Sequence, residues 1–520
     1  MIRRPAVLLA LILTLLLPLT AAPAMASGAA AQAIRVVDIP AGDVVLKGNV
    51  AEPGTPGPHP AVIMPSSWGL NDLEYLAQAR ALATRGYVVV SYTPRGWWLS
   101  GGRIDTAGPR DLADLSGVID WTLANTAADP ARIGAAGVSY GAGISLLGAG
   151  TDPRIRAVGV LSGWTDLADS LYADQTRHRQ AADLLGLAAR TLGRPGPELA
   201  GRLDDFAAGR DLPGVVAWAG ERSAARHVAA INANRPAVLI ANAWGDSFFP
   251  PAQLGEFYER LIGPKRLELR PGDHAIAELT GLLGLGNEVW ASLYRWFDEH
   301  LAGRDTGISA EPPVQIRPLN APAEGYASWQ ALTGTPRRHA LGAIRALDGT
   351  GLLGGAPGTG WAKTLPADRD TVANGGLVLL TNGAAAFTGR RPSIWLPAVN
   401  RARAGVWAAE RPATVQRLRG APRLHLELTG TQSRGTLVAY LYDLDRAGTA
   451  TLITHAPASW LDGGGTRTLD VDLWPTAYDL PAGHSLTLVV DTTDPLYYDE
   501  NDPGRTITIA AGSTLDVPLR

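Results

Sequence analysis

Residues 132–143 read Arg-Ile-Gly-Ala-Ala-Gly-Val-Ser-Tyr-Gly-Ala-Gly. Five of them, Gly137-Val138-Ser139-Tyr140-Gly141, fit the G-x-S-x-G nucleophile elbow, in which a strained turn between a strand and a helix exposes a serine hydroxyl. The flanks supply that context, because residues 133–138 are apolar like a buried strand and the small residues of 142–147 are typical of a packed helix. The alternative is an ordinary Gly-rich strand-to-helix turn. The context favours Ser139 as a nucleophile.

A serine hydroxyl needs a base to act as a nucleophile near neutral pH, and the base needs a carboxylate that orients it. In α/β-hydrolases the chain order is Ser, then Asp or Glu, then His, and each residue follows a strand. Asp246 follows the apolar segment 236–242, and His274 follows the alternating segment 266–270. We therefore predict Asp246 as the acid and His274 as the base.

Both assignments have competitors. Asp246 could instead cap a helix that begins near residue 250, and Asp273 is a second candidate acid. A carboxylate next to the histidine in sequence more often shapes the loop, which favours Asp246. The chain has nine histidines, of which His178 and His227 are weaker candidates for the base because they lie in a segment without strands. Only His274 follows a strand at the required place in the order.

An oxyanion hole needs two donors that point at the developing negative oxygen. One is expected to be the backbone N–H of Tyr140, directly after the nucleophile, and the other comes from a loop after an earlier strand. Residues 60–64 predict that strand, and residues 65–70 (Pro-Ser-Ser-Trp-Gly-Leu) predict the loop. We expect the second donor to be the backbone N–H of Ser67 or Trp68. The alternative is a Ser-rich turn without a catalytic role.

Apolar strand-like runs alternate with helical segments from about residue 34 to residue 303. This alternation predicts a doubly wound α/β sheet, so we assign residues 27–303 to an α/β domain. Residues 165–230 interrupt the alternation with amphipathic helical stretches. They predict a helical cap over the site, with Trp164 and Trp218 as candidate pocket walls. Ordinary extra helices at the sheet edge are the alternative.

Residues 304–312 resemble a linker, and the helix signal nearly disappears after them. We predict an all-β jelly-roll sandwich over residues 304–520. Its strands are expected at 314–317, 376–380, 423–428, 435–441, 468–473 and 485–490. The sandwich could bind carbohydrate, cover the mouth of the site or mediate oligomers. The acidic residues 494–502 predict a solvated loop, with a calcium site as the alternative.

The first 26 residues combine Arg3 and Arg4, an apolar run over 6–19 and a small-residue ending, which predicts a signal peptide at 1–26 and a secreted protein. Its removal would change the formal net charge from −3 to −5, because two arginines are lost. A slightly acidic chain without basic blocks does not predict a nucleic-acid partner, and no stable membrane insertion is expected after cleavage. The chain has no cysteine, so it has neither disulfides nor a thiol nucleophile.

Two family resemblances follow from these motifs. Residues 61–95 resemble the dienelactone hydrolase family, whose loop also reads Trp-Gly-Leu-Asn, although that family carries cysteine where this chain has Ser139. The whole chain resembles the cocaine esterase and X-prolyl dipeptidyl peptidase family of serine hydrolases. Residues 95–102 (Arg-Gly-Trp-Trp-Leu-Ser-Gly-Gly) resemble that family's Arg-Gly-x-Gly-x-Ser-x-Gly loop, with Trp98 in place of a glycine. Residues 244–249 (Trp-Gly-Asp-Ser-Phe-Phe) resemble its acid loop, and the β-rich second half is the third shared feature.

The resemblance implies an α/β-hydrolase that cleaves esters, amides or X-Pro peptides through an acyl-enzyme, without a metal or organic cofactor. Family members often place a tyrosine in the oxyanion loop, but residues 65–70 contain none, which leaves the backbone-amide donors. The expected partner is a small ester, amide or peptide substrate, and the oligomeric state is left open. Aminopeptidase action would need a carboxylate for the substrate amine, and Asp166, Asp169 and Asp174 in the cap segment could supply it.

Two other functions are compatible with the same residues. One is a non-catalytic secreted binding protein that uses the sandwich and retains only the hydrolase frame. The presence of all three triad residues in the right order argues against it. The other is a lipase-like esterase in which Trp97 and Trp98 contact a lipid interface.

Overall fold

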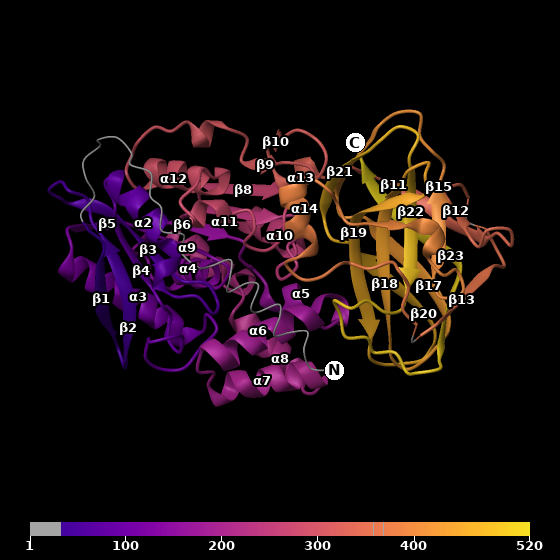
Figure 1. Ribbon diagram of the computed structural model, residues 1–520, viewed down its shortest axis with the longest axis horizontal. Helices are drawn as coiled ribbons and strands as arrows, with labels where there is room; N and C mark the ends of the chain where they lie inside the picture. Colours follow the sequence, from indigo (N-terminus) through magenta and orange to yellow (C-terminus); the bar gives the residue numbers. More distant parts are fainter. Residues whose placement is uncertain (1–32, 357, 368) are drawn as a thin grey trace.

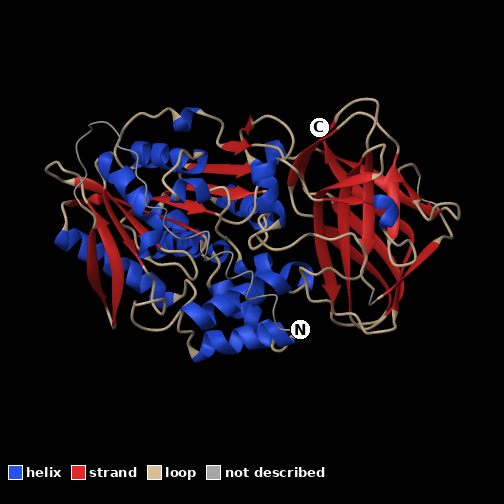
Figure 2. Cartoon of the chain, in the orientation of Figure 1, coloured by secondary structure: helices blue, strands red, loops and turns tan. Residues whose placement is uncertain are grey.

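The computed structural model describes residues 33–356, 358–367 and 369–520. Two domains lie side by side along its long axis (Figure 1). The first, indigo to magenta, mixes helices and strands, and the second, orange to yellow, consists almost entirely of strands (Figure 2). The segment predicted to be a signal peptide, 1–26, lies outside the described residues.

The first domain is built on a ten-stranded sheet with the order β1-β2-β4-β3-β5-β6-β7-β8-β9-β10. The seven neighbouring strands from β4 to β9 pair in parallel, whereas β1, β2 and β10 pair antiparallel. The strands are β1 (Arg35–Ala41), β2 (Val44–Ala51), β3 (His59–Pro65), β4 (Val88–Tyr92), β5 (Ala128–Val138), β6 (Ile155–Leu161), β7 (Ala237–Ala243), β8 (Lys265–Arg270), β9 (Val314–Ile316) and β10 (Glu324–Tyr326). The chain reverses its winding direction at β3 and β5, so the loops after these two strands open at the edge where ligands bind in such sheets.

Helices cover both faces of this sheet, which explains why its central strands are apolar runs rather than alternating ones. Leu115 of α3 and Ile144 of α4 belong to the core on one face, and Leu82 of α2 and Leu293 of α12 belong to the core on the other. The helices outside the cap are η1 (Asp72–Tyr75), α2 (Leu76–Thr84), α3 (Pro109–Asn125), α4 (Tyr140–Thr151), α10 (Ala252–Arg260), α11 (Leu279–Leu282) and α12 (Glu288–His300). The doubly wound α/β prediction is confirmed.

The segment 165–230 consists of helices joined by loops and contributes no strand to a sheet, as predicted. It contains α5 (Leu167–Tyr172), η2 (Ala173–Gln175), α6 (Arg179–Leu192), α7 (Pro197–Ala208), α8 (Leu212–Glu221), η3 (Ala224–Arg226) and the start of α9 (Val228–Asn234). His178 caps α6, since its side chain accepts the Ala181 N–H. In Figure 1 these helices lie below the sheet and reach toward the second domain.

The second domain is all-β, as predicted, and packs its own apolar core. Strand β11 joins its two sheets, because it pairs with β12 in one and with β23 in the other. The strands are β11 (Thr335–Ile344), β12 (Gly351–Leu353), β13 (Ala362–Pro366), β14 (Ser393–Trp395), β15 (Gly405–Ala409), β16 (Gln416–Gly420), β17 (Arg423–Thr431), β18 (Gly435–Leu444), β19 (Thr449–Trp460), β20 (Gly465–Asp472), β21 (Thr476–Leu480), β22 (Ser485–Asp491) and β23 (Thr506–Leu519). The short helices after residue 303 are η4 (Ile308–Ala310), α13 (Trp329–Leu332), α14 (Thr381–Thr388) and η5 (Leu396–Ala398).

Two of the six predicted sandwich strands are wrong. Residues 314–316 form β9, which pairs in parallel with β8, so the strands of the first sheet continue to residue 326, past the predicted boundary at 303 and 304. Residues 376–380 form no strand, because positive φ angles at Gly376 and Leu379 turn the backbone into α14. The Leu377 N–H donates to the Thr381 hydroxyl across this turn.

Candidate active site

Ser139 lies at the turn between β5 and α4, with a φ of 56° that strains a residue with a side chain. Both flanking glycines are needed for close backbone contact. A Cβ on Gly137 would lie 2.5 Å from the carbonyl carbon of Gly141, and a Cβ on Gly141 would lie 2.0 Å from the Pro65 carbonyl oxygen. The elbow therefore packs closely against the loop that follows β3.

Gly141→Ala is expected to lower the free energy of unfolding by at least about 3 kcal/mol, since the backbone of the Pro65 loop must move to admit the methyl group. The matched control is Gly201→Ala in α7, where a Cβ meets no atom within 4 Å. This control is expected to raise stability by about 1 kcal/mol, because alanine is the better helix former. Denaturant unfolding measures both. Equal stability of Gly141→Ala and the wild-type protein would contradict the contact.

The three predicted triad residues come together. The Ser139 Oγ lies 2.9 Å from the His274 Nε2, and the His274 Nδ1 lies 3.0 Å from the Asp246 Oδ2. All three side chains are buried, with Asp246 at 0% exposure. The arrangement suits a base that removes the serine proton and a carboxylate that fixes the imidazole and offsets its positive charge.

Asp246 and His274 each make further contacts besides their contact with one another. The Asp246 Oδ1 accepts the backbone N–H groups of Phe248 and Phe249, and the two phenyl rings contact the imidazole at centroid distances of 4.8 and 5.1 Å. Burial by itself lowers the pKa of His274, but the negative charge of Asp246 and its hydrogen bond outweigh that effect and raise this pKa above 6.5. The imidazole is therefore a stronger base than a free histidine.

The competing acid, Asp273, does not contact the imidazole ring. Its Oδ1 accepts the backbone N–H of His274 and both the N–H and the hydroxyl of Ser247. Burial raises the pKa of Asp273 to about 7. Asp273 thus shapes the histidine loop, as residues next to the histidine usually do.

The predicted oxyanion donors are only partly available. Tyr140 is the first residue of α4, where a helix leaves N–H groups without intrahelical acceptors. The prediction for Ser67 is wrong, because its N–H donates to the Glu74 carboxylate at 2.7 Å and its hydroxyl contacts the same carboxylate. The Trp68 N–H remains the candidate second donor. The indole of Trp68 lies edge-on to the Tyr140 ring at 5.1 Å.

Three carboxyl groups that were not predicted surround this centre, two of them buried (Asp111 and Glu278) and one half-buried (Glu74). Glu74 holds the oxyanion loop, Glu278 accepts the Ser162 hydroxyl, and Asp111 accepts the Tyr140 hydroxyl. Burial raises the pKa of Glu74 and Glu278 to about 7 and that of Asp111 to about 8. The sequence carries no signal for them, because their partners lie on other elements of the fold.

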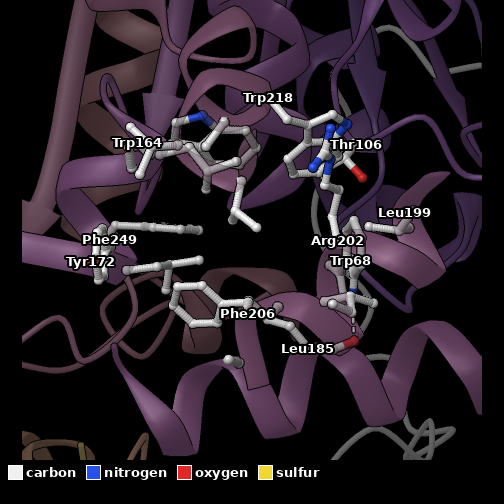
Figure 3. A pocket seen from close by; sticks show the side chains of 18 of the residues that line it. Trp68, Thr106, Trp164, Tyr172, Leu185, Leu199, Arg202, Phe206, Trp218 and Phe249 are labelled. Atoms are coloured by element: carbon white, nitrogen blue, oxygen red, sulfur yellow. Dashed lines mark hydrogen bonds between the residues drawn. The ribbon is translucent and has the colours of Figure 1, made fainter. Parts of the chain in front are cut away.

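A cavity opens at Ser139 between the sheet and the cap (Figure 3). Its wall is mainly aromatic and aliphatic, with Trp68, Trp164, Tyr172, Phe206, Trp218 and Phe249 among its residues. In Figure 3, Tyr172 and Phe249 lie on one side of the cavity and Trp218 and Arg202 on the other. The positions predicted for Trp164 and Trp218 as pocket walls agree with the structure.

Among the residues that the structure describes, Arg202 is the only charged one in the wall of this cavity, and its guanidinium pairs with Asp211 at 2.8 Å. None of the three candidate amine partners lines the cavity. The Asp166 carboxylate caps α5 instead. Asp169 and Asp174 are exposed to solvent.

Only one member of the tryptophan pair proposed as a lipid contact reaches the surface, because Trp98 is 38% exposed. Trp97 is fully buried and packs on Trp68 at 4.8 Å, and Trp98 donates its indole N–H to the Gly69 carbonyl. Trp97 and Trp98 therefore support the oxyanion loop from behind.

The β domain contacts the catalytic loops directly. The backbone N–H of Leu379 donates to the Ser247 hydroxyl, and the Asn382 side chain donates to the Gly245 carbonyl, each at 3.0 Å. Gly245 and Ser247 flank Asp246 in the chain. This support could not be predicted from the sequence, because the apolar residues 376–380 are typical of a strand.

The acidic loop 494–502 is not solvated as predicted. Glu500 is buried and pairs with Arg177 of the cap at 2.8 Å and with Arg434. Asp494 is also buried and accepts the Tyr440 hydroxyl at 2.8 Å. Within the described ranges, no three His, Asp or Glu residues are grouped so that they could hold a metal ion. No helix in the same part of the chain is long and apolar enough to cross a membrane.

Comparison with known families identifies both halves of the chain. Residues 42–276 match the family model described as X-Pro dipeptidyl-peptidase (S15 family), and residues 409–517 match that of the X-Pro dipeptidyl-peptidase C-terminal non-catalytic domain. The chain belongs to the S15 family. Family and fold together make this S15 protein a serine hydrolase of the peptidase and esterase type.

Solved structures share the whole architecture of the S15 chain. A CocE/NonD family hydrolase from Staphylococcus aureus is 13% identical with a TM-score of 0.69, and 94% of each chain is covered. An α-amino acid ester hydrolase is 16% identical with a TM-score of 0.68, over 96% of this chain and 99% of that one. An aminopeptidase from a Thaumarchaeota archaeon is 15% identical with a TM-score of 0.69, over 94% and 96%. At sequence identities this low, the structural similarity shows a shared fold.

A curated relative of the S15 chain, the uncharacterised protein YcjY of Escherichia coli K12, is 36% identical over 91 residues. The match spans 16% of this chain and 28% of the length of that protein.

Proposed function

We propose that the protein is an esterase that hydrolyses esters with apolar acyl groups through an acyl-enzyme on Ser139. His274 removes the Ser139 proton through Nε2 as Oγ attacks the ester carbonyl. Asp246 stabilises the imidazolium that results, and the imidazolium then protonates the departing alkoxide. A water molecule, deprotonated by His274, cleaves the acyl-enzyme and releases the carboxylic acid and free Ser139.

The tetrahedral intermediates carry a negative oxygen in a buried site, where Ser139 and His274 are each 7% exposed. We assign its two donors to the backbone N–H groups of Tyr140 and Trp68. Preorganised donors of this kind contribute about 3–4 kcal/mol each to transition-state stabilisation. The contact of Gly141 with the Pro65 carbonyl keeps the two donor-bearing loops together.

The composition of the cavity wall is the observation that supports an apolar ester substrate. The described part of the chain contributes no carboxylate to this wall and a single guanidinium, which already pairs with Asp211. The free amine of a dipeptidyl substrate would enter this cavity charged and without a partner, which is strongly unfavourable. An aliphatic or aromatic acyl group would instead gain about 25 cal/mol for each Å² of apolar surface removed from water.

The test compares three substrates with the purified protein. We expect kcat/KM to rise from the acetate to the octanoate ester of 4-nitrophenol, by about tenfold or more, because each buried methylene contributes about 0.8 kcal/mol. Alanyl-proline 4-nitroanilide is expected to be a poor substrate, at least a hundredfold below the octanoate. Preference for the anilide, or for the acetate over the octanoate, would contradict the proposal.

A second candidate is X-Pro dipeptidyl-peptidase action, which the description of the matching family favours. The same comparison of esters with the prolyl anilide distinguishes the two activities. We also propose that the protein is exported, on the basis of the signal-like composition of residues 1–26.

A further inference from the structure

A second cavity, of about 470 Å³, lies between the two domains and shares no lining residue with the cavity at Ser139. The α/β domain contributes the loops that contain Gly245 and Gly272, and the β domain contributes α14 and parts of β19 and β21. Figure 1 shows α14 between the helices beside β8 and the strands near β19. The cavity therefore lies behind the loops that present Asp246 and His274.

Arg391 lines this cavity without an ion-pair partner among the described residues, although the negative charge of Asp443 acts on it from farther away. Among the described residues no carboxylate lies within ion-pair distance of it, and its Nη1 is buried without a hydrogen-bond acceptor. Its nearest recorded contact is the ring of Tyr478, 5.3 Å from the guanidinium carbon. Arg391 is half-buried. Loss of contact with water lowers its pKa to about 10, so the group stays charged at neutral pH. A charge held partly out of water in this way is stabilised by a counter-ion.

The rest of the wall adds positive charge that local carboxylates only partly balance. Arg270 and Arg317 also line the cavity. Arg317 pairs with Glu288, but the carboxylate that Arg270 contacts, Glu268, is shared with Arg266. The cavity thus has more guanidinium groups than carboxylates. The buried hydroxyl of Thr476 also lies in this wall and has no hydrogen-bond partner among the described residues.

Apolar side chains face the same space. The apolar part of the wall includes Ile276, Leu319, Phe387, Leu452, Ile453 and Trp474. Phe387 on α14 is 61% exposed, although a phenyl ring gains free energy when it is covered. Cationic and apolar groups together match a ligand with a charged end and an apolar body, and they do not match a small hydrated ion.

We propose that this interdomain cavity binds an organic carboxylate with an apolar body, whose carboxylate pairs with Arg391. The site does not depend on the chemistry at Ser139. A failure of the proposed esterase activity would therefore not contradict it. Because Gly245 and Gly272 form part of the wall, a bound carboxylate contacts the loops that support Asp246 and His274.

Titration calorimetry of the full-length protein with octanoate tests the site without measuring hydrolysis. Arg391→Gln is expected to weaken octanoate binding at least about tenfold, because a hydrogen-bonded charge pair is lost. Arg390→Gln, an exposed neighbour, is the matched control and should bind like the wild-type protein. Arg391→Lys keeps the charge and should retain most of the affinity, which separates loss of the ion pair from loss of folding.

Two outcomes would overturn the proposal. Equal octanoate affinity of Arg391→Gln and the wild-type protein would place any bound octanoate elsewhere, including the cavity at Ser139. Inorganic phosphate that binds as tightly as octanoate, with the same dependence on Arg391, would make the site one for a simple anion. Thermal unfolding of Arg391→Gln checks that the variant is folded before either result is interpreted.

Discussion

Ser139→Ala lowers kcat/KM for 4-nitrophenyl octanoate by about 10⁴- to 10⁶-fold, which is the largest effect we expect from any single substitution. The variant loses the oxygen that lies 2.9 Å from the His274 Nε2, and no other hydroxyl is recorded in contact with that nitrogen. The fold should persist, because Ser139 makes few other contacts and alanine tolerates the same backbone about as well as serine. Steady-state kinetics and circular dichroism measure the two effects separately.

The matched control is Ser145→Ala, one and a half turns further along α4. The Ser145 hydroxyl donates only to the Gly141 carbonyl within the helix, so its removal should change kcat/KM by less than about threefold. A fluorophosphonate should label the wild-type protein and Ser145→Ala at Ser139, and leave Ser139→Ala unlabelled. Hydrolysis at the wild-type rate by Ser139→Ala would refute an acyl-enzyme on Ser139.

Asp246→Asn should lower kcat by about 10⁴-fold while leaving the fold in place. The asparagine Oδ1 can still accept the N–H groups of Phe248 and Phe249, as the aspartate does. Its amide nitrogen, however, would face the His274 Nδ1 and donate to it. His274 would then carry its proton on Nε2, where it cannot accept the Ser139 proton.

Asp273→Asn is the matched control for the acid, and we expect less than a tenfold loss of kcat. Its pKa of about 7 means that Asp273 is already partly protonated at neutral pH, and an amide oxygen can replace its Oδ1 as acceptor. The wild-type pH profile should rise through an apparent pKa above 6.5, because activity needs neutral His274 and its pKa is raised. A loss in Asp273→Asn as large as in Asp246→Asn would show that the acid is misassigned.

The triad could be predicted from the sequence because each member follows an apolar strand, and strand ends in a parallel sheet meet at one edge. Asp246 and His274 could be identified from their order in the chain and from the strands that precede them. The atom that stabilises the oxyanion could not be chosen in the same way. The sequence predicts that the donor lies in the loop 65–70. The Ser67 N–H, however, already donates to the Glu74 carboxylate, and this hydrogen bond forms only when η1 folds against the loop.

The errors in the second half have a common physical cause. An apolar run of three to five residues does not specify its neighbours, so residues 314–316 and 376–380 looked alike in the sequence. The first run joins the edge of the catalytic sheet beside β8. The second turns at Gly376 and leads into α14. Only long-range packing distinguishes them.

The contact between α14 and the catalytic loops also has a consequence for how the chain is made. Synthesis proceeds from the N-terminus, and domains fold as they emerge. All three triad residues have been added once residue 274 is in place, but Leu379 and Asn382 come about a hundred residues later. Strand β23, the last of the chain, pairs with four strands of the β domain. The nascent chain therefore carries a complete set of reacting groups well before α14 and β23 are made, and we expect full activity only once both have folded.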